Sequence, residues 1–440
     1  MVEREQQCHH REAHDLTAVD CRLLHDCSQR GVYVVRTFWT SWQQRLPWRD
    51  TTPNSTRPIA ISANRKTDVA IVGAGILGLA HAYFAAKRGR SVVVFERTPR
   101  ALGASVRNFG MIWPIGQRAG AVHQMAMRSR QLWQEILDAS GSPYRPNGSL
   151  HVVYHQDEAE VAREFAERAP GFGYACTWLS PADVLRKSQA VNPEGLLGGI
   201  WSPTELTVDP RDILARLPAF LTEKFGVQFR FGTAVRSIQL PRIEAGSDIW
   251  LAAQAIVCGG DDFETLYPEL FAGSAIDRCK LQMMRTAPQK NGWELGPALA
   301  AGLTLRFYPA FEICTATLPK YKERVARELA DYDRWAIHTL VSQTADGALT
   351  LGDSHEYGLA VDVFNKTEID ELVLQNVRTF LIAPDLSIAQ RWYGVYAKHP
   401  DKSWAAIDAA PGVRIVTAVG GSGMTLSFGL AEQMIGEMNI

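Results

Sequence analysis

Residues 68–96 read DVAIVGAGILGLAHAYFAAKRGRSVVVFE. A short apolar run, a glycine turn, a helical apolar pattern and a second apolar run follow one another, which predicts a strand, a helix and a strand. Gly73, Gly75 and Gly78 complete the pattern G-x-G-x-x-G. The first glycine permits the turn, the second lets a pyrophosphate approach the backbone, and the third lets helix and strand pack closely. This stretch therefore predicts a dinucleotide site within an α/β fold.

The acid that ends the second apolar run bears on which nucleotide is bound. Glu96 stands where a carboxylate can bind both ribose hydroxyls of an adenosine, and it would repel a 2′-phosphate, which disfavours NADP. The N-terminus of the intervening helix would offer unpaired N–H groups to the phosphates. The motif alone does not separate FAD from NAD.

The bulk composition excludes several classes of protein. The chain has 440 residues, which suits two domains or one domain with a large insertion, and its net charge of −1 gives no general attraction to nucleic acid or to an anionic membrane. No run of 18 or more apolar residues predicts a membrane-spanning helix. The seven cysteines are scattered and lack CxxC spacing, which argues against a disulfide framework or zinc site and favours reduced thiols in a cytoplasmic protein.

Residues 1–65 differ from the remainder of the chain. They carry three of the seven cysteines and many Arg and Gln residues, and they show neither a sustained apolar period nor the order of a signal peptide. Cys8, His9, His10 and His14 are followed by no second ligand pair at a fixed spacing, so we expect no metal site. We predict a disordered or weakly ordered extension and a fold that starts near Lys66.

Further stretches, in the right order, resemble the D-amino acid oxidase superfamily of FAD-dependent oxidoreductases, which includes glycine oxidase and sarcosine oxidase. They are RTPRALGASVRNFGMIWP (97–114), LTVDPRDIL (206–214), VQFRFGTAVRSI (227–238) with IWLAAQAIVCGGDDF (249–263), and GVRIVTAVGGSGMTLSFGLAEQM (412–434). The last is a second strand, glycine turn and helix, and its helix N-terminus would stabilise the negative charge of a reduced flavin. The resemblance covers residues 66–440 and implies FAD rather than NAD. Neither Cys279 nor Cys314 matches the family's attachment context, so the FAD is expected to be non-covalent.

The resemblance implies a discontinuous architecture. A Rossmann-like, GR2-type FAD-binding domain is expected from 66–147, 207–280 and 388–440, and an inserted, mostly antiparallel β-sheet substrate domain from 148–206 and 281–387. Strand-like patterns in the insertion include SLHVVYH, KLQMMRTA, LTLRFYPAF, WAIHTLVSQT and ALTLGDS. The residues expected to contact the cofactor are Gly73, Gly75, Ile76, Leu77, Gly78, Glu96, Arg97, Ser105, Asn108, Phe109, Gly110, Val235, Gly259, Gly260, Gly421, Gly423, Met424 and Thr425.

The implied reaction moves a hydride from the carbon beside an amine nitrogen to the flavin, and the imine that results is hydrolysed by water. Its partners would be a small-molecule amine and O2 or another electron acceptor. Such a reaction needs positioning more than a strong base. Candidates for a catalytic role are Asn108, His338, His355 and Tyr357. His338 could equally be a packed strand residue, and GDSHEYG (352–358) a hydrogen-bonded turn that fixes its loop.

Relatives that oxidise amino acids usually hold a carboxylate with an arginine and a tyrosine. The segment QRWYGVYAKHPD (390–401) carries more positive charge than one carboxylate requires, which favours a phosphonate or phosphate dianion. RNFGMIWPIGQ, CKLQMMRTAPQ and GDSHEYG resemble a subgroup associated with phosphonate catabolism, which implies 2-aminoethylphosphonate or its N-methyl derivative as substrate and phosphonoacetaldehyde as product. The candidate substrate-binding residues are Arg107, Arg285, Arg306, Tyr308, Arg391, Tyr396, Lys398 and His399.

Three alternatives remain open. The first is a glycine, sarcosine or D-amino acid oxidase or dehydrogenase in which Arg391 holds a carboxylate. The second is a 2-hydroxy acid dehydrogenase with His338 or His355 as the base. The third is a protein that binds flavin without catalysis.

Overall fold

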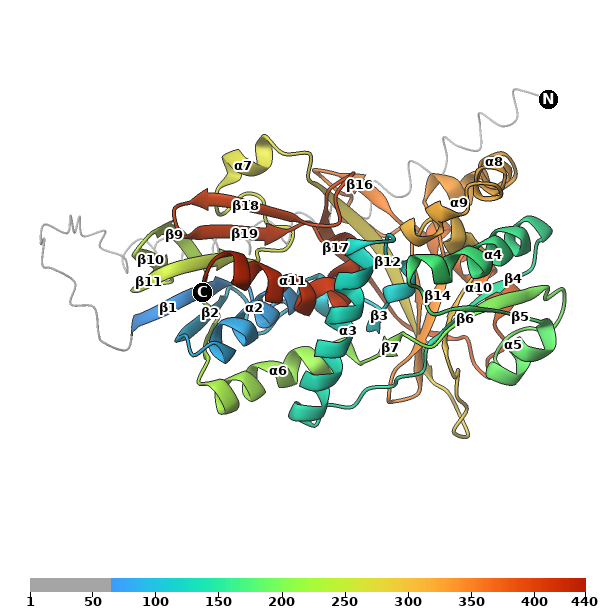
Figure 1. Cartoon of the computed structure of the whole chain (residues 1–440), viewed down its shortest axis with the longest axis horizontal. Coiled ribbons are helices and arrows are strands. Elements are labelled where there is room, and N and C mark those ends of the chain that lie inside the picture. The colour runs from blue at the N-terminus through green and yellow to red at the C-terminus, as the bar shows by residue number, and fades with distance from the viewer. Residues whose placement is uncertain (1–64) are drawn as a thin grey trace, which may run out of the picture. The chain divides into compact units, whose positions relative to one another are not determined.

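The strand, helix and strand expected at 66–96 form in the computed structural model, which describes residues 65–440 (Figure 1). They are β1 (Lys66–Val72), α2 (Ile76–Lys87) and β2 (Val92–Glu96). The extension predicted for 1–65 and the cysteine and histidines near its start lie outside the described residues, except for Arg65.

A first sheet of eight strands carries this unit. Its main path runs β18-β19-β11-β1-β2-β8, and the β9–β10 hairpin pairs with β11. Strands β8, β2, β1, β11 and β19 are parallel, whereas β18 is antiparallel to β19. The further strands are β8 (Gln228–Phe231), β9 (Val235–Gln239), β10 (Arg242–Ala245), β11 (Asp248–Val257), β18 (Ala405–Ala410) and β19 (Val413–Thr417).

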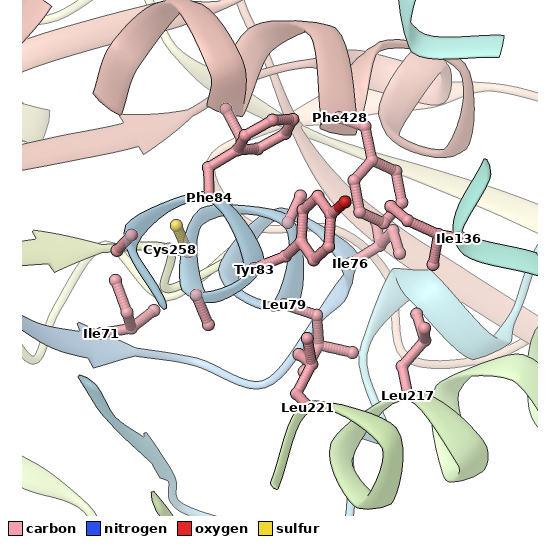
Figure 2. Close-up of a cluster of buried hydrophobic side chains, with 14 of the residues drawn as sticks. Ile71, Ile76, Leu79, Tyr83, Phe84, Ile136, Leu217, Leu221, Cys258 and Phe428 are labelled. Carbon is pink, nitrogen blue, oxygen red and sulfur yellow. The ribbon is translucent and has the colours of Figure 1, made fainter. Parts of the chain in front are cut away.

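Both faces of this sheet are buried, and alternate residues of β1 serve different faces. Ile71 packs against the helices, whereas Ala70 belongs to the cluster on the other face, which includes the β9–β10 hairpin. Figure 2 shows the helical side, where the rings of Tyr83 and Phe428 lie next to each other. The helices here are α2, α3 (Ala121–Ser140), α6 (Pro210–Phe225) and α11 (Gly423–Glu437).

Helix α6 begins as LTVDPRDIL predicts. The Asp209 carboxylate accepts hydrogen bonds from the backbone N–H groups of Arg211 and Asp212, at 2.9 and 3.4 Å, and Pro210 occupies the first helical position. This cap fixes the start of the helix next to the segment 108–112.

A second sheet of nine strands follows the path β16-β12-β15-β14-β13-β4-β6-β5, with β17 paired to β12. Every pair is antiparallel except β13 with β4, which confirms a mostly antiparallel inserted sheet. Its strands are β4 (Ser149–Val153), β5 (Thr177–Leu179), β6 (Gly198–Ser202), β12 (Asp277–Pro288), β13 (Ala298–Ala300), β14 (Leu340–Gln343), β15 (Ala348–Gly352), β16 (Glu356–Gly358) and β17 (Ile388–Lys398). The remaining elements are the β3–β7 pair (Met111–Ile112 and Leu206–Thr207), α4 (Gln156–Arg168), α5 (Pro181–Lys187), α7 (Pro268–Ala272), α8 (Leu318–Glu328), α9 (Ala330–Arg334) and α10 (Thr367–Phe380).

The structure differs from the sequence expectation at three places. LTLRFYPAF forms two short 3-10 turns, at 302–306 and 309–313, because Pro309 cannot donate to a ladder and the apolar side chains of the segment are buried without a period of two. His338 lies just before β14 rather than within a strand. β17, grouped with the cofactor part on sequence, pairs along β12 in the second sheet because Asp277 to Thr286 offer it a continuous edge.

Within residues 65–440, no helix combines the length and the apolar character needed to cross a membrane.

Candidate active site

A cavity of about 830 Å³ is lined by residues that both sheets contribute. Its first-sheet end includes Gly75, Glu96 and Gly259, which follow the carboxyl ends of β1, β2 and β11. Its second-sheet end includes His338 and Lys398. A ligand site at the carboxyl ends of parallel strands is the arrangement expected of an open α/β sheet.

The glycine turn at the first-sheet end is packed so closely that Gly73 and Gly78 have no room for a side chain. Gly73 has a φ of +101°, and a Cβ on it would lie 2.3 Å from the carbonyl oxygen of Cys258. A Cβ on Gly78 would lie 1.9 Å from the carbonyl oxygen of Gly73. Gly75 lines the cavity, and helix α2 begins there without a side-chain cap. The roles predicted for the turn and for the packing of Gly78 fit this geometry.

Glu96 is held in a fixed orientation at the cavity wall. One carboxylate oxygen accepts a hydrogen bond from the Ala74 N–H at 3.0 Å, and the other accepts from the N–H and hydroxyl of Thr98, at 3.0 and 2.6 Å. A carboxylate can accept about four hydrogen bonds, so acceptor capacity remains for a ribose.

A second helix N-terminus reaches the same cavity. Helix α11 begins at Gly423 without a side-chain cap, and Gly421, Met424 and Thr425 line the cavity with it. The helix is anchored because the Trp133 indole N–H donates to the Met424 carbonyl oxygen at 2.7 Å. Two helix N-termini whose N-cap residues make no side-chain hydrogen bond meet at one cavity, and at α2 the Ile76 N–H donates to the Ser105 hydroxyl. Such termini suit a ligand with a pyrophosphate and a ring that gains negative charge, so the residues present fit FAD.

Most of the expected cofactor residues line the cavity, but Gly78 and Gly110 do not. A Cβ on Gly110 would lie 1.9 Å from the Val208 carbonyl oxygen, so this glycine lets two loops pack rather than facing a ligand. Asn108 lines the cavity, but its amide donates to Ala104 and Ser105 and accepts from Gly110. The lining residues from the expected set are Gly73, Gly75, Ile76, Leu77, Glu96, Arg97, Ser105, Asn108, Phe109, Val235, Gly259, Gly260, Gly421, Gly423, Met424 and Thr425.

Aromatic rings and two histidines form the second-sheet wall. The Phe307 ring stacks on His338 with centroids 3.7 Å apart and lies 4.4 Å from the His355 ring. Asp353 lies between the two imidazoles: its carboxylate oxygens are 3.3 Å from His338 Nε2 and 4.0 Å from His355 Nε2. Tyr308 and Tyr396 also line the cavity.

Burial decides the charge states of the titratable side chains in this wall. Desolvation lowers the pKa of His355 to about 3 and lowers the pKa of His338 well below its ordinary value, so both imidazoles are neutral at pH 7. The same desolvation raises the pKa of Asp353 well above the ordinary value. His355 Nδ1 lies 3.1 Å from the Ala336 carbonyl oxygen, which implies that Nδ1 carries the proton and leaves Nε2 as an acceptor.

Two of the expected anion-binding cations line the cavity without a carboxylate partner among residues 65–440. Lys398 Nζ lies 3.4 Å from the Tyr357 hydroxyl and over the Phe307 ring, 5.7 Å from its centroid. Arg107 donates to the Tyr393 carbonyl oxygen at 3.2 Å, which leaves other N–H donors of its guanidinium for a ligand. His399 is also a lining residue.

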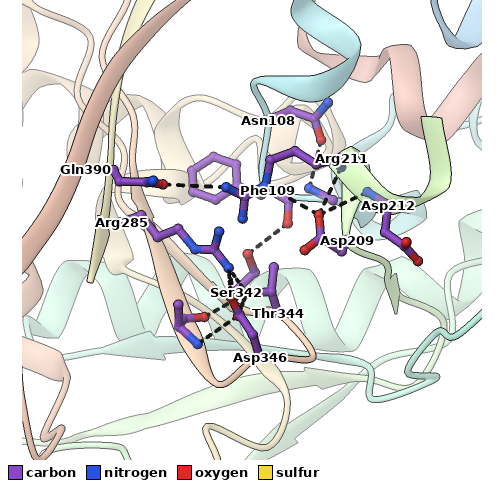
Figure 3. Close-up of polar contacts among 12 residues, drawn as sticks. Asn108, Phe109, Asp209, Arg211, Asp212, Arg285, Ser342, Thr344, Asp346 and Gln390 are labelled. Atoms are coloured by element: carbon purple, nitrogen blue, oxygen red, sulfur yellow. Dashed lines mark hydrogen bonds and ion pairs between the residues drawn. The ribbon is translucent and has the colours of Figure 1, made fainter. Parts of the chain in front are cut away.

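Four other expected residues do not line the cavity. Arg285 is buried and donates to Asp346 and Thr344, as Figure 3 shows. Arg391 forms an ion pair with Asp370 at 3.0 Å and lines a second cavity. Arg306 donates to the carbonyl oxygens of Tyr332 and Ile337, and Tyr357 is about half exposed. Three of the four candidate arginines, Arg285, Arg306 and Arg391, therefore bind partners away from the cavity.

Among the lining residues that the sequence analysis did not single out are Phe307, Trp113 and Asp353. Phe307 lies in LTLRFYPAF, which was expected to be a strand, and Trp113 lies in the family-like segment 97–114 but was not named as a candidate. The Trp113 indole N–H is buried without a hydrogen-bond partner among the described residues. The position of Asp353 in the sequence could have marked it as a candidate, since it follows directly after the apolar strand β15. An acid at the end of a buried strand is a common place for a functional side chain.

Comparison with known proteins gives a consistent result. The profile of the family described as "FAD dependent oxidoreductase" (DAO) matches residues 68–436. The bifunctional protein ThiO/ThiG of Nostoc sp. is 29% identical over 181 residues, which are 39% of this chain and 26% of that protein. The mitochondrial sarcosine dehydrogenase of Homo sapiens is 23% identical over 227 residues, 46% of this chain and 24% of that protein. The matches thus span about a quarter of the length of these curated relatives.

Among solved structures, glycine oxidase from Geobacillus kaustophilus superposes with a TM-score of 0.67 at 17% identity, over 85% of this chain and 94% of that one. At this identity the likeness concerns the fold, and it agrees with the two sheets described above.

Proposed function

This chain belongs to the FAD dependent oxidoreductase family, and we propose that it oxidises a small amine carrying an anionic group, at the carbon beside the nitrogen. The observation that supports this proposal is that one cavity is lined both by the glycine turn and by Arg107 and Lys398, two cations without a carboxylate partner within residues 65–440. Bound FAD supplies the hydride acceptor. In this proposal residues 66–147, 207–280 and 388–440 hold FAD, although β17 and the start of β12 pair in the second sheet, and residues 148–206 and 281–387 hold the substrate.

The chain's own residues would position the substrate and exclude water from around it. Lys398 and Arg107 would bind the acidic group, and the rings of Phe307 and Tyr308 would exclude water from the reacting carbon. Cys279 and Cys314 are buried and do not line the cavity, which supports a non-covalent cofactor. The four free cysteines of the described part are consistent with the cytoplasmic location that we propose.

Two substrate classes fit the proposal, and they differ in whether the acidic group is a phosphonate or a carboxylate. A phosphonate such as 2-aminoethylphosphonate or its N-methyl derivative is supported by the convergence of Arg107, Lys398 and His399 on the cavity. An amino acid such as glycine or sarcosine is favoured by the absence of Arg285 and Arg391 from the cavity, because a single carboxylate requires less positive charge.

Anaerobic flavin bleaching separates these classes. The purified yellow protein is mixed with N-methyl-2-aminoethylphosphonate, 2-aminoethylphosphonate, sarcosine, glycine and a 2-hydroxy acid, and the flavin absorbance is followed. Faster bleaching by phosphonates is the result expected of a dianion site. Faster bleaching by glycine or sarcosine would assign the site to amino acids, and bleaching only by the hydroxy acid would contradict the proposed amine chemistry.

Replacing Glu96 with alanine is expected to weaken FAD binding by roughly 10- to 100-fold, because two hydrogen bonds from a ribose to a charged acceptor are lost. The measurement is the dissociation constant from titration of the apoprotein with FAD. Glu167→Ala, on the exposed face of α4, is the control and should bind FAD like the wild type. An unchanged constant for Glu96→Ala would show that the ribose does not contact this carboxylate.

A further inference from the structure

Asp353 is a buried carboxyl group that no cation of the described chain neutralises. The residue is 7% exposed, lines the cavity, and has a carboxylate oxygen, Oδ1, without a hydrogen-bond partner among residues 65–440. The basic groups within 4 Å are His338 and His355, and burial holds both of them neutral. A buried charge without a partner is costly, and a cationic group on a bound molecule would offset that cost.

The other groups around this carboxyl do not change that conclusion. Burial raises the pKa of Tyr308 and of Tyr396, so both phenols stay neutral. The charges of Lys398 and Arg306 lower the pKa of the two imidazoles. The pKa of Asp353 itself is raised by burial and lowered, to a smaller extent, by a hydrogen bond from its own backbone. The titratable groups that face this cluster are His338, His355, Tyr308, Tyr357, Tyr396, Cys279, Lys398 and Arg306.

Asp353 adjoins the loop that is expected to meet the flavin ring. A Cβ on the preceding residue, Gly352, would lie 3.4 Å from the Phe109 ring. From the neighbouring strand β14, the Ser342 hydroxyl donates to the Phe109 carbonyl oxygen at 2.8 Å, as Figure 3 shows. The second sheet therefore brings the carboxyl group to the segment 105–109, on the wall of the same cavity.

We propose that Asp353, in its ionised form, receives the ammonium group of the substrate and accepts one of its protons, which makes it a catalytic residue. The inference rests on the proposed amine oxidation, because only a neutral amine can release a hydride from the neighbouring carbon. The ammonium N–H bond breaks, an O–H bond forms on Asp353, and the nitrogen keeps the electron pair. When FAD is bound, it would accept the hydride from the neighbouring carbon, and with it the two electrons that the amine gives up. The proton on Asp353 returns to water after the product leaves.

The test is the pH dependence of anaerobic flavin reduction in Asp353→Asn, compared with the wild type from pH 6 to 10. Without the acceptor, the variant must take the neutral amine from solution, and an amine with a pKa of about 10 is only about one part in 1000 neutral at pH 7. We expect the variant to be about 100- to 1000-fold slower at pH 7, to gain about tenfold per pH unit, and to approach the wild type near pH 10. Asp331→Asn, on an exposed position of α9, is the matched control.

Different results bear on different claims. If wild-type flavin is reduced and Asp353→Asn is slower by one factor at every pH, the residue is only structural and this inference falls. If the variant is as fast as the wild type at pH 7, the inference also falls. If no amine reduces the wild-type flavin at any pH, the proposed amine oxidation fails first.

Thermal unfolding without substrate gives a readout that needs no turnover. Burial raises the pKa of Asp353 in the folded state above its unfolded value, so the stabilising contribution of the protonated acid is present at low pH and is lost as the pH rises through the folded pKa. We expect Asp353→Asn to melt about 2 °C or more above the wild type at pH 8, with the gap closing toward pH 5. A variant that melts below the wild type at pH 8 would show that Asp353 is already compensated, which overturns the inference.

Discussion

Gly78→Val is expected to give a protein without bound flavin and with most of its stability lost. A Cβ at this position would lie 1.9 Å from the Gly73 carbonyl oxygen and 3.3 Å from a methyl group of Ile71, and valine adds two further carbons. The Gly73 backbone has no room to move away from α2, since a Cβ on Gly73 itself would already lie 2.3 Å from the carbonyl oxygen of Cys258. Helix α2 must then leave β1, a change that costs about 4 kcal/mol or more of a total near 5–15 kcal/mol.

The measurement for Gly78→Val is the urea midpoint of unfolding together with the flavin content of the purified protein. Gly171→Val is the control, since a Cβ there meets nothing within 4 Å and the residue lies far along the chain in the second-sheet part. Gly78→Val protein that is yellow and unfolds at the wild-type midpoint would show that α2 and β1 are not packed as described.

Lys398→Met is expected to lower kcat/KM for the best substrate by about 100-fold or more. Truncating one partner of a largely desolvated charge pair costs about 2–5 kcal/mol, and Lys398 is the lining cation that lies over the Phe307 ring beside the two histidines. Methionine keeps the length and the apolar contacts of the side chain, so the flavin content and the melting temperature should stay near wild type.

Steady-state kinetics with the best substrate and with the same amine lacking its acidic group checks this expectation. The variant should lose the preference for the acidic amine while treating the neutral amine like the wild type. Lys320→Met, exposed on α8, should change neither rate. If Lys398→Met keeps the wild-type preference, the acidic group is bound elsewhere, and Arg107 becomes the residue to replace.

The cofactor part of the fold was predictable because its requirements are local. Gly73, Gly75 and Gly78 are separated by a few residues, and their roles depend only on the turn that they form. The capped start of α6 was predictable for the same reason, since Asp209 binds the N–H groups of the next turn.

The anion site was harder to predict because side-chain direction depends on the strand. Arg391 and Lys398 both lie in β17, and their register against β12 is regular between them. They are an odd number of residues apart, so they point to opposite faces, and only Lys398 lines the cavity. Arg285 was assigned to the site because its ion-pair partner, Asp346, is distant in sequence, so a local sequence pattern does not reveal the pair.

Burial explains the remaining misses. LTLRFYPAF resembled a strand because its apolar residues are dense, but they are buried in the second-sheet part as two short turns. Asp353 gave no sign in the sequence that its carboxyl would be enclosed without a cation, because that property arises from residues on separate elements, such as His338 and Tyr396.

The measurement that tests the central claim most directly is single-turnover flavin reduction with the best acidic amine, unlabelled or carrying deuterium on the carbon beside the nitrogen. Breaking that C–H bond in the hydride transfer predicts reduction that is several-fold slower with the labelled substrate and unchanged when the label is on another carbon. Absence of flavin reduction by every acidic amine tested, or a product that keeps all of its label at that carbon, would contradict the account.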